Sequence, residues 1–271
     1  MPELPEVETT RRGIATGVLG QPVRAVVVRQ PRLRWPVPRS LMRELPGHTI
    51  DSITRRGKYL LLGTRAGTVI LHLGMSGSLR LVPQTTAPEK HDHVDLLLAN
   101  GKCLRLRDPR RFGAVLWTRS DPLQHKLLVH LGPDPLAADF DGEHLYRRSR
   151  GRVRAIRDFL IDGREVAGIG NIYANEALFA AGIDPRRGAG QISHHRYRRL
   201  ARALRTTLRR GIARGGATLR DYCSSDGRPG YFQLSTSVYG RDGKPCRVCG
   251  RRVRAQVLGA RRVFFCTRCQ L

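Results

Sequence analysis

Four cysteines near the C-terminus constrain the fold of this chain most tightly. Cys246 and Cys249 are separated by two residues, as are Cys266 and Cys269, and sixteen residues lie between the two pairs. This is the spacing of a tetrahedral four-thiolate zinc site, in which each pair binds the metal from a tight turn. Four unrelated buried cysteines would account poorly for the paired spacing. We predict one structural Zn²⁺, because four protein ligands leave no open position for catalysis.

The charge balance points to a polyanionic partner. The chain carries 49 Lys and Arg against 22 Asp and Glu, a formal net charge of +27. Arginine dominates the cations, and its planar guanidinium makes bidentate contacts to phosphate. An arginine-rich codon usage would raise the count without explaining the shortage of acids. We therefore expect nucleic acid as the partner, bound in a salt-dependent way.

Several features indicate a cytoplasmic protein without a membrane segment. No apolar run reaches about 18 residues, the minimum for a transmembrane helix. The first ten residues, MPELPEVETT, are acidic and lack the apolar stretch of a signal peptide. Cytoplasmic thiols stay reduced, which argues against disulfides. Cys103 lies within a strand pattern and is predicted to be an inert core residue, whereas Cys223 is assigned no role.

The residue pattern of the chain differs between its two halves. Between residues 23 and 116, short runs of branched aliphatic residues alternate with turn residues, and Asn100-Gly101 between two runs is a hairpin signal. Strands without intervening helices favour a sandwich or a barrel. The runs are 23–29, 59–62, 68–73, 94–99 and 102–107.

Helical patterns lie on both sides of this β region. A first helix follows the N-terminus, with Pro5 at its first position and Leu4, Val7 and Ile14 on one face. Residues 130–142 are rich in Pro, Gly and Asp and predict a linker. Three further helices are predicted at 153–162, 171–182 and 193–215, with Gly182 and Gly215 at helix ends.

Longer motifs resemble the bacterial formamidopyrimidine-DNA glycosylases, the 8-oxoguanine DNA glycosylases, nearly from end to end. They are 2-PELPEVET-9, 58-KYLLL-62, 72-HLGMSG-77, 90-KHDHVD-95, 108-DPRRFG-113, 168-GIGNIYANE-176, 225-SDGRPGYF-232, 239-YG-240 and the cysteine pairs.

The resemblance implies an α+β multidomain fold. We expect an antiparallel β-sandwich with its leading helix at 1–132, a helical helix–two-turn–helix domain at 133–240 and a zinc finger at 241–271. A monomer would bind damaged double-stranded DNA in the basic cleft between the two halves, at the nucleoid of a bacterium.

The resemblance also implies a catalytic group at the N-terminus. Pro2 would be the nucleophile that forms a Schiff base, Glu3 the general acid and Lys58 a second catalytic group. Once Met1 is removed, Pro2 carries an α-amine with a pKa near about 8, far below the value of about 10.4 for lysine. Taken alone, Pro2 would be only a residue before a helix and Lys58 a basic surface residue.

An enzyme that extrudes a base must fill the gap left in the stack. By resemblance Met75, Arg110 and Phe112 are the wedges, and Arg110 would favour cytosine opposite the lesion. Composition alone would place Met75 and Phe112 in the core.

Further residues would contact DNA. Asn171 would bind phosphate at a helix start, although an N-cap role is equally open. Arg157 stands where the family usually has lysine, Arg261 would also donate the proton for elimination, Glu6 would line the lesion pocket, and residues 217–232 would form a flap. The full set of implied DNA contacts is His72, His93, Arg111, Arg157, Asn171, Tyr239 and Arg261.

These features predict a bifunctional base-excision-repair enzyme that removes oxidised purines and nicks by β,δ-elimination. One alternative is an endonuclease VIII-type enzyme for oxidised pyrimidines, against which Leu4-Pro5 argues. The other is a non-enzymatic zinc-finger DNA-binding protein, which leaves Pro2, Glu3 and Lys58 unexplained.

Overall fold

The structure is a computed structural model that describes residues 1–215 and 236–271. The predicted flap at 217–232, the 225–232 motif and Cys223 lie outside the described residues. Met1–Val129 form one compact unit. His130–Ala213 form a second unit together with residues 236–271. No helix among the described residues is both long enough and apolar enough to cross a membrane.

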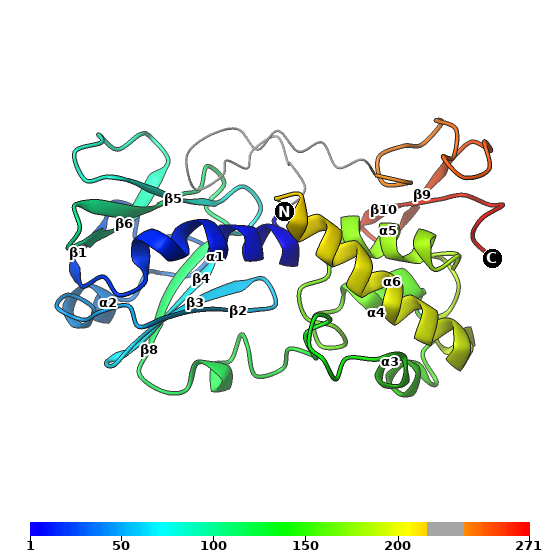
Figure 1. Ribbon diagram of the computed structural model, residues 1–271, viewed down its shortest axis with the longest axis horizontal. Helices are drawn as coiled ribbons and strands as arrows, with labels where there is room; N and C mark the ends of the chain where they lie inside the picture. The colour runs from blue at the N-terminus through cyan, green and yellow to red at the C-terminus, as the bar shows by residue number, and fades with distance from the viewer. Residues whose placement is uncertain (216–235) are drawn as a thin grey trace. The chain divides into compact units, whose positions relative to one another are not determined.

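The N-terminal unit is a sandwich of two four-stranded antiparallel sheets, as Figure 1 shows. This confirms the predicted fold class. Strands β2, β5 and β8 are not apparent in the sequence; β2, for example, has a single buried residue, Ile53. One sheet has the order β1 (Val23–Val28), β6 (Asp92–Leu98), β7 (Lys102–Arg107), β5 (Ser78–Pro83). The other has the order β2 (Ser52–Arg56), β3 (Tyr59–Thr64), β4 (Gly67–His72), β8 (Ala114–Thr118).

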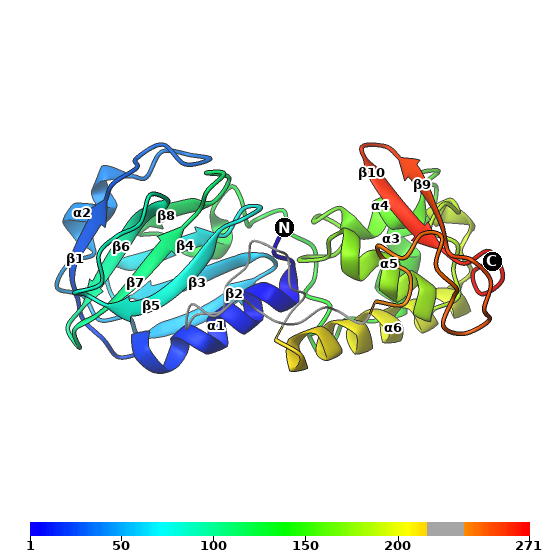
Figure 2. The ribbon, with the colours of Figure 1, turned by 90° about the horizontal axis from the view of Figure 1, so that it is seen from above.

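Two helices cover the edges of the sandwich. Helix α1 (Leu4–Val18) contacts the edge strands β2 and β5, and α2 (Arg39–Glu44) contacts the opposite edge strands β1 and β8 (Figure 2). The predicted face of α1 is buried. Because the helix begins at Leu4, Pro5 is its second residue and not its first. Edge strands present unpaired backbone groups, so these helices also protect the sheets from pairing with other chains.

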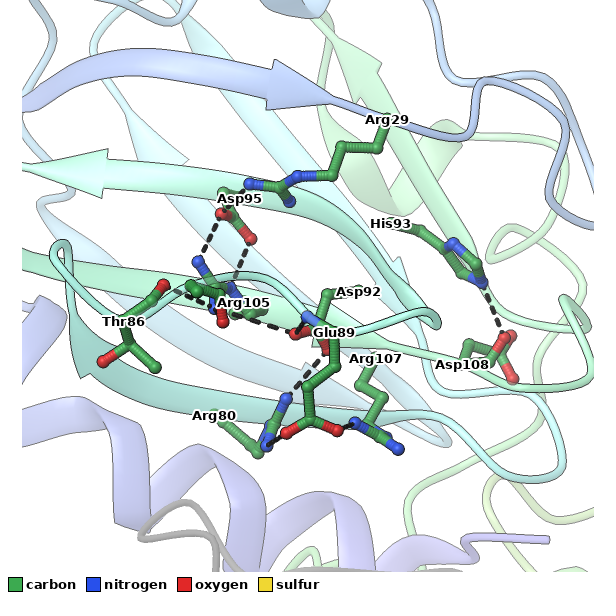
Figure 3. Close-up of polar contacts among 11 residues, drawn as sticks. Arg29, Arg80, Thr86, Glu89, Asp92, His93, Asp95, Arg105, Arg107 and Asp108 are labelled. Carbon is green, nitrogen blue, oxygen red and sulfur yellow. Dashed lines mark hydrogen bonds and ion pairs between the residues drawn. The ribbon is translucent and has the colours of Figure 1, made fainter.

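The outer face of the first sheet holds a buried ion network, drawn in Figure 3. The Arg105 guanidinium lies 2.9 Å from Asp95, and Arg29 and Arg80 pair with Asp95 and Asp92 at 2.6 and 2.8 Å. Arg105 also donates to the Thr86 carbonyl at 3.1 Å. Buried charges are tolerated when they are paired and hydrogen-bonded in this way. The network therefore fastens the segment before β6 to the sheet.

The second unit is helical and carries a short β-ribbon. Its helices are α3 (Gly142–Ser149), α4 (Ile156–Ile161), α5 (Asn171–Ala180) and α6 (His194–Ala213), with 3-10 turns at Ala189–Gln191 and, in the first unit, Pro122–Gln124. Helix α3 is not apparent in the sequence, and α4 is shorter than predicted. Gly182 and Gly215 have positive φ values just beyond helix ends, as predicted.

The cysteine-rich tail is not separate from the helices. Its ribbon consists of β9 (Arg254–Leu258) and β10 (Arg261–Phe265), and β10 contacts α5. The finger thus lies in the same compact unit as the helices, whereas the sequence suggests an independent domain.

Candidate functional site

Lys58 lies at the tip of the β2–β3 hairpin. Arg56 pairs with Tyr59, so Gly57 and Lys58 form a two-residue turn. Gly57 has φ +58°, the conformation that a type II′ turn requires at its first position. Glycine adopts this value without the steric cost that a side chain adds. The turn presents Lys58, which is half-buried, at a defined point on the unit.

The chain's N-terminal amine lies within the electrostatic influence of the predicted catalytic residues. Pro2 and Glu3 are buried. Burial lowers the pKa of the Met1 amine, Glu3 and Glu6 oppose this shift, and Lys58 and Arg110 lower it further. A lowered pKa keeps more of an amine unprotonated and nucleophilic near neutral pH. The predicted group is thus gathered at one end of the sandwich.

The first turn of α1 holds Glu3 and Glu6 in place. Glu3 is the N-cap, and its backbone N–H donates to the Glu6 carboxylate at 2.8 Å in a capping box. Both acids are buried. The helix start thereby supplies two carboxylates beside the N-terminus.

His72 is a neutral hydrogen-bond donor. Its Nδ1 accepts the Gly74 N–H at 3.0 Å, which places the ring proton on Nε2. Its ring packs on Tyr59 with centroids 4.7 Å apart. Burial, with the charges of Lys58 and Arg34, lowers the pKa of His72 to about 4. The histidine can therefore donate from Nε2 without carrying a charge.

The three predicted wedge residues are all on the surface. Met75 is 37% exposed and Phe112 is 45% exposed, which excludes the core placement that composition alone favours. The Arg110 guanidinium lies over the Phe112 ring, 4.8 Å from its centroid. An exposed methionine beside an exposed arginine–aromatic pair is suited to enter a base stack.

Close backbone approach joins the two turns that carry these wedges. A Cβ built on Gly74 would lie 2.4 Å from the Phe112 carbonyl carbon, and one on Gly113 would lie 2.8 Å from the His72 carbonyl oxygen. Only glycine fits at either position. Arg111, between the two wedges Arg110 and Phe112, has φ +56°, a strained value for a residue with a side chain.

His93, for which a DNA contact is predicted, has a buried side chain. Its Nε2 lies 2.9 Å from the Asp108 carbonyl oxygen (Figure 3). His91, two residues earlier in the same motif, is only half-buried, and its ring lies 6.4 Å from that of His93. Strand alternation would place two residues at this spacing on the same face, so it does not separate them; His91 precedes β6, and the pairing register shifts between Asp92 and Val94.

Arg157 also differs from the prediction. Its side chain is 1% exposed and cannot contact phosphate directly as it lies. The guanidinium donates to the Leu258 carbonyl at 2.7 Å and to the Arg261 carbonyl at 3.4 Å, and contacts Asp158 at 3.0 Å. Burial lowers its pKa. Arg157 therefore holds both ends of the turn of the β9–β10 hairpin.

Asn171 is the first residue of α5, and Gly170 is the N-cap, so the N-cap alternative is wrong. The Asn171 amide donates to the Arg262 carbonyl at 3.0 Å. Asn175, one turn later and fully buried, donates to the Asn171 carbonyl and accepts the Phe264 N–H at 2.8 Å. Two amides of α5 thus hold the hairpin strand β10.

Glu176 is a further positioning residue that the sequence does not reveal. Its carboxylate accepts the backbone N–H groups of Ser237, Val238 and Tyr239 at 2.8 to 2.9 Å. The Tyr239 ring packs against Phe264 with centroids 5.0 Å apart. Helix α5 therefore also orders the segment before the finger.

Arg261 follows the Gly259-Ala260 turn and is exposed. Gly259 has φ +58°, as Gly57 does in the first unit. Arg261 begins β10, so the turn, the Arg157 clamp and the strand together set the position of its backbone.

The four predicted zinc ligands converge. Their Sγ atoms lie within 4.8 Å of one another, with Cys249–Cys266 at 3.4 Å and Cys246–Cys269 at 3.9 Å. A Zn–S bond of about 2.3 Å places tetrahedral sulfurs about 3.8 Å apart. The donor set fits one structural Zn²⁺.

Cys103, by contrast, is fully buried in β7. Burial, reinforced by Asp95, raises the pKa of its thiol to about 12. The prediction of an inert core cysteine is confirmed.

Comparison with known proteins extends over the whole chain. Three family models match: the formamidopyrimidine-DNA glycosylase N-terminal domain at residues 1–115, its H2TH domain at 131–223, and the zinc finger found in FPG and IleRS at 243–271. Formamidopyrimidine-DNA glycosylase of Syntrophotalea carbinolica is 57% identical over 270 residues, covering 100% of both chains.

Two solved structures show the same fold. A mutant of the Lactococcus lactis FPG in complex with DNA that contains Fapy-dG superimposes with a TM-score of 0.91 at 33% identity, covering 99% of each chain. A MutM protein bound to DNA with carbocyclic 8-oxo-G has a TM-score of 0.90 at 33% identity, again over 99% of each chain. These matches show that the chain belongs to the formamidopyrimidine-DNA glycosylase family.

Proposed function

We propose that this protein removes oxidised purines, 8-oxoguanine and formamidopyrimidines, from double-stranded DNA and then cleaves the strand by β,δ-elimination. The observation that carries the proposal is the buried Pro2-Glu3 start of the chain, where the N-terminal amine lies within the electrostatic influence of Glu3 and Lys58. A zinc-finger protein that only binds DNA has no need of such an amine. The family relationship favours oxidised purines over oxidised pyrimidines.

Base removal begins at Pro2 once Met1 has been cleaved. The Pro2 nitrogen lone pair forms a bond to the sugar C1′, and the base departs with the electrons of the glycosidic bond and takes up a proton. Glu3 then protonates the ring oxygen O4′, so that the sugar opens and a Schiff base forms between Pro2 and C1′. The burial of both residues keeps bulk water from the amine.

Strand cleavage follows from the Schiff base. Loss of a C2′ proton expels the 3′ phosphate, and a second elimination expels the 5′ phosphate. Water then releases Pro2 from the sugar fragment. Lys58, at the tip of its hairpin, is a second catalytic group near the sugar and the phosphate. Arg261 is the proton donor for elimination.

The lesion must leave the duplex before this chemistry. Met75, Arg110 and Phe112 would fill the gap, with Arg110 facing the opposite cytosine. The exposure of Met75 and Phe112 and the contact between Arg110 and Phe112 support this role. Glu6 would line the lesion pocket beside Glu3.

Phosphate binding is assigned to Arg111, Asn171, Tyr239 and Arg261, which are partly or fully exposed, and to His72, a buried residue that offers a neutral Nε2–H. His91 takes the contact first predicted for His93. Burial makes His93 and Arg157 positioning residues in this scheme.

The wider setting is also proposed. A sandwich at 1–132, a helical domain at 133–240 and a finger at 241–271 would act together as a monomer on chromosomal DNA in a bacterial cytoplasm. The family's domain matches and the excess of positive charge support this setting.

Covalent trapping tests the proposal. The purified protein is incubated with an 8-oxoguanine:cytosine duplex and borohydride, and the adduct is mapped by mass spectrometry. We expect one adduct on Pro2, in a chain that lacks Met1. An adduct that forms only with an oxidised-pyrimidine duplex would show that the substrates are oxidised pyrimidines. No adduct with any lesion, despite tight DNA binding and bound zinc, would leave a non-enzymatic binding protein.

A further inference from the structure

The wedge residues come from two separate turns that must hold a fixed spacing. Met75 lies on the turn from β4 to β5, which passes from one sheet to the other. Arg110 and Phe112 lie on the connection from β7 to β8, which makes the same passage. The backbones of the two turns approach closely at Gly74 and Gly113, and a side-chain contact adds to this connection.

One hydroxyl group bridges these two turns. Ser76, next to Met75, is 5% exposed. Its Oγ donates to Asp108 Oδ1 at 3.0 Å and accepts the backbone N–H of Arg110 at 3.3 Å. The side chain of a residue on the first turn therefore contacts the backbone of the arginine on the second.

The Asp108 carboxylate that receives this hydroxyl is itself fixed. Asp108 is fully buried, and its Oδ2 accepts the Gly113 N–H at 2.7 Å. Its backbone N–H donates to the His91 carbonyl at 3.0 Å, and its carbonyl accepts from His93 and from the Arg111 N–H. A carboxylate held at both oxygens allows the Ser76 hydroxyl one orientation, in which the lone pair faces Arg110.

We propose that Ser76 is a specificity-determining positioning residue, which sets Arg110 relative to Met75 through the Ser76–Asp108 pair and so controls discrimination of the base opposite the lesion. This rests on the proposed role of Arg110 in facing that base. Ser76 does not touch DNA in this scheme. It acts through the backbone of Arg110, because a small displacement of a wedge changes which base its guanidinium can reach.

The test compares single-turnover excision of 8-oxoguanine opposite cytosine and opposite adenine. Ser76→Ala removes the bridge, and we expect the cytosine-to-adenine rate ratio to fall about five- to tenfold, within the usual effect of one buried hydrogen bond. Ser76→Thr keeps the hydroxyl and restores the ratio. Ser120→Ala, at an exposed serine of the same unit, serves as the matched control and leaves the ratio unchanged. Thermal melting of each variant reports folding.

The outcomes separate this inference from the function on which it rests. Arg110→Ala is the reference variant, and a reduced ratio for both Arg110→Ala and Ser76→Ala supports the proposal. Suppose that Arg110→Ala lowers the ratio, whereas Ser76→Ala slows excision from both duplexes equally or from neither. The positioning role of Ser76 is then overturned, and the role of Arg110 in recognising the opposite base stands. An unchanged ratio for Arg110→Ala would overturn both. Should Ser76→Ala fail to fold, Asp108→Asn disturbs the same pair with little change of shape and is judged by the same ratio.

Discussion

Two hairpins of the same local geometry carry two cations of the proposed reaction. In the N-terminal unit the Gly57-Lys58 turn joins β2 to β3, and in the second unit the Gly259-Ala260 turn joins β9 to β10 and is followed by Arg261. In each case the first turn residue is a glycine with φ +58°. Local sequence specifies both turns in the same way.

The support behind the two turns differs. Leu60 and Leu62 of β3 are fully buried in the sandwich core. In the second hairpin β9 has no buried residue, whereas the last three residues of β10 are buried, and the Arg157 guanidinium, the amides of Asn171 and Asn175 and the cysteine cluster add directed contacts. The same turn is thus held mainly by apolar burial in one place and by one buried strand together with polar contacts and a metal site in another.

Removal of zinc should produce the largest difference between the two hairpins in their structure and function. A structural zinc site contributes about 10–16 kcal/mol to folding of its module. We expect Cys249→Ser, or chelation, to unfold the finger and reduce DNA nicking at least about 100-fold, since phosphate contacts and Arg261 are lost together. The sandwich should keep its β-sheet circular dichroism. Zinc content and nicking are measured on the same preparation.

Cys103→Ala is the matched control for the zinc site, because Cys103 is a buried thiol outside the cluster. It should retain full zinc and most of the nicking activity. Nicking that survives complete loss of zinc would show that the finger's hairpin does not depend on the metal.

Truncation of a side chain in β3 should destabilise the protein far more than truncation of a side chain in β9. Leu62→Ala leaves a cavity in the sandwich and should lower the free energy of unfolding by about 2–5 kcal/mol. Val257→Ala, at a 65% exposed position of β9, should change it by less than about 0.5 kcal/mol. Denaturant unfolding measures both. Equal effects would mean that the finger ribbon is packed more tightly than its exposure indicates.

The Arg157 clamp should matter only for the second hairpin. Lysine keeps the charge but lacks the planar fork that reaches two carbonyls, so Arg157→Lys should slow the second elimination about fivefold. Zinc content and trapping at Pro2 should stay unchanged. The ratio of β- to δ-elimination products is the measurement, with Arg209→Lys on an exposed position of α6 as the control. An unchanged product ratio would show that Arg157 has a structural role only and does not affect the second elimination.

The smallest expected effect is a shift in pH dependence at the first hairpin. The Pro2 amine acts when it is unprotonated, so trapping should rise with pH through its pKa, for which the ordinary value of an α-amine is about 8. With Met1 in place, the positive charge of Lys58 lowers the pKa of the terminal amine, and we expect the same effect on Pro2. Lys58→Gln should therefore move the rising limb of the pH profile of trapping to higher pH, and it should also lower the trapping rate. A limb that stays in place would show that Lys58 does not act on the amine.

Much of the fold and of the metal site could be predicted from local sequence patterns. The cysteine spacing predicted the metal ligands, and aliphatic runs separated by turn residues predicted the sandwich. Gly182 and Gly215 marked helix ends because only glycine takes a left-handed conformation there without cost. The spacing of Leu4, Val7 and Ile14 predicted the buried face of α1. Each of these features depends on residues that are close in sequence.

Other features depended on partners far along the chain. Arg157 contacts a carbonyl 101 residues away, so a side chain predicted to bind DNA also acts as an internal clamp. Asn175, which the sequence did not single out, accepts a backbone N–H 89 residues away. His93 and His91 differ in burial, and Met75 and Phe112 lie outside the core, for reasons that composition does not contain. The sequence by itself determined which chemical groups the protein carries and which short segments form turns, helices and metal ligands. Only the tertiary structure decided which of the polar groups reach solvent, because their burial depends on partners far along the chain.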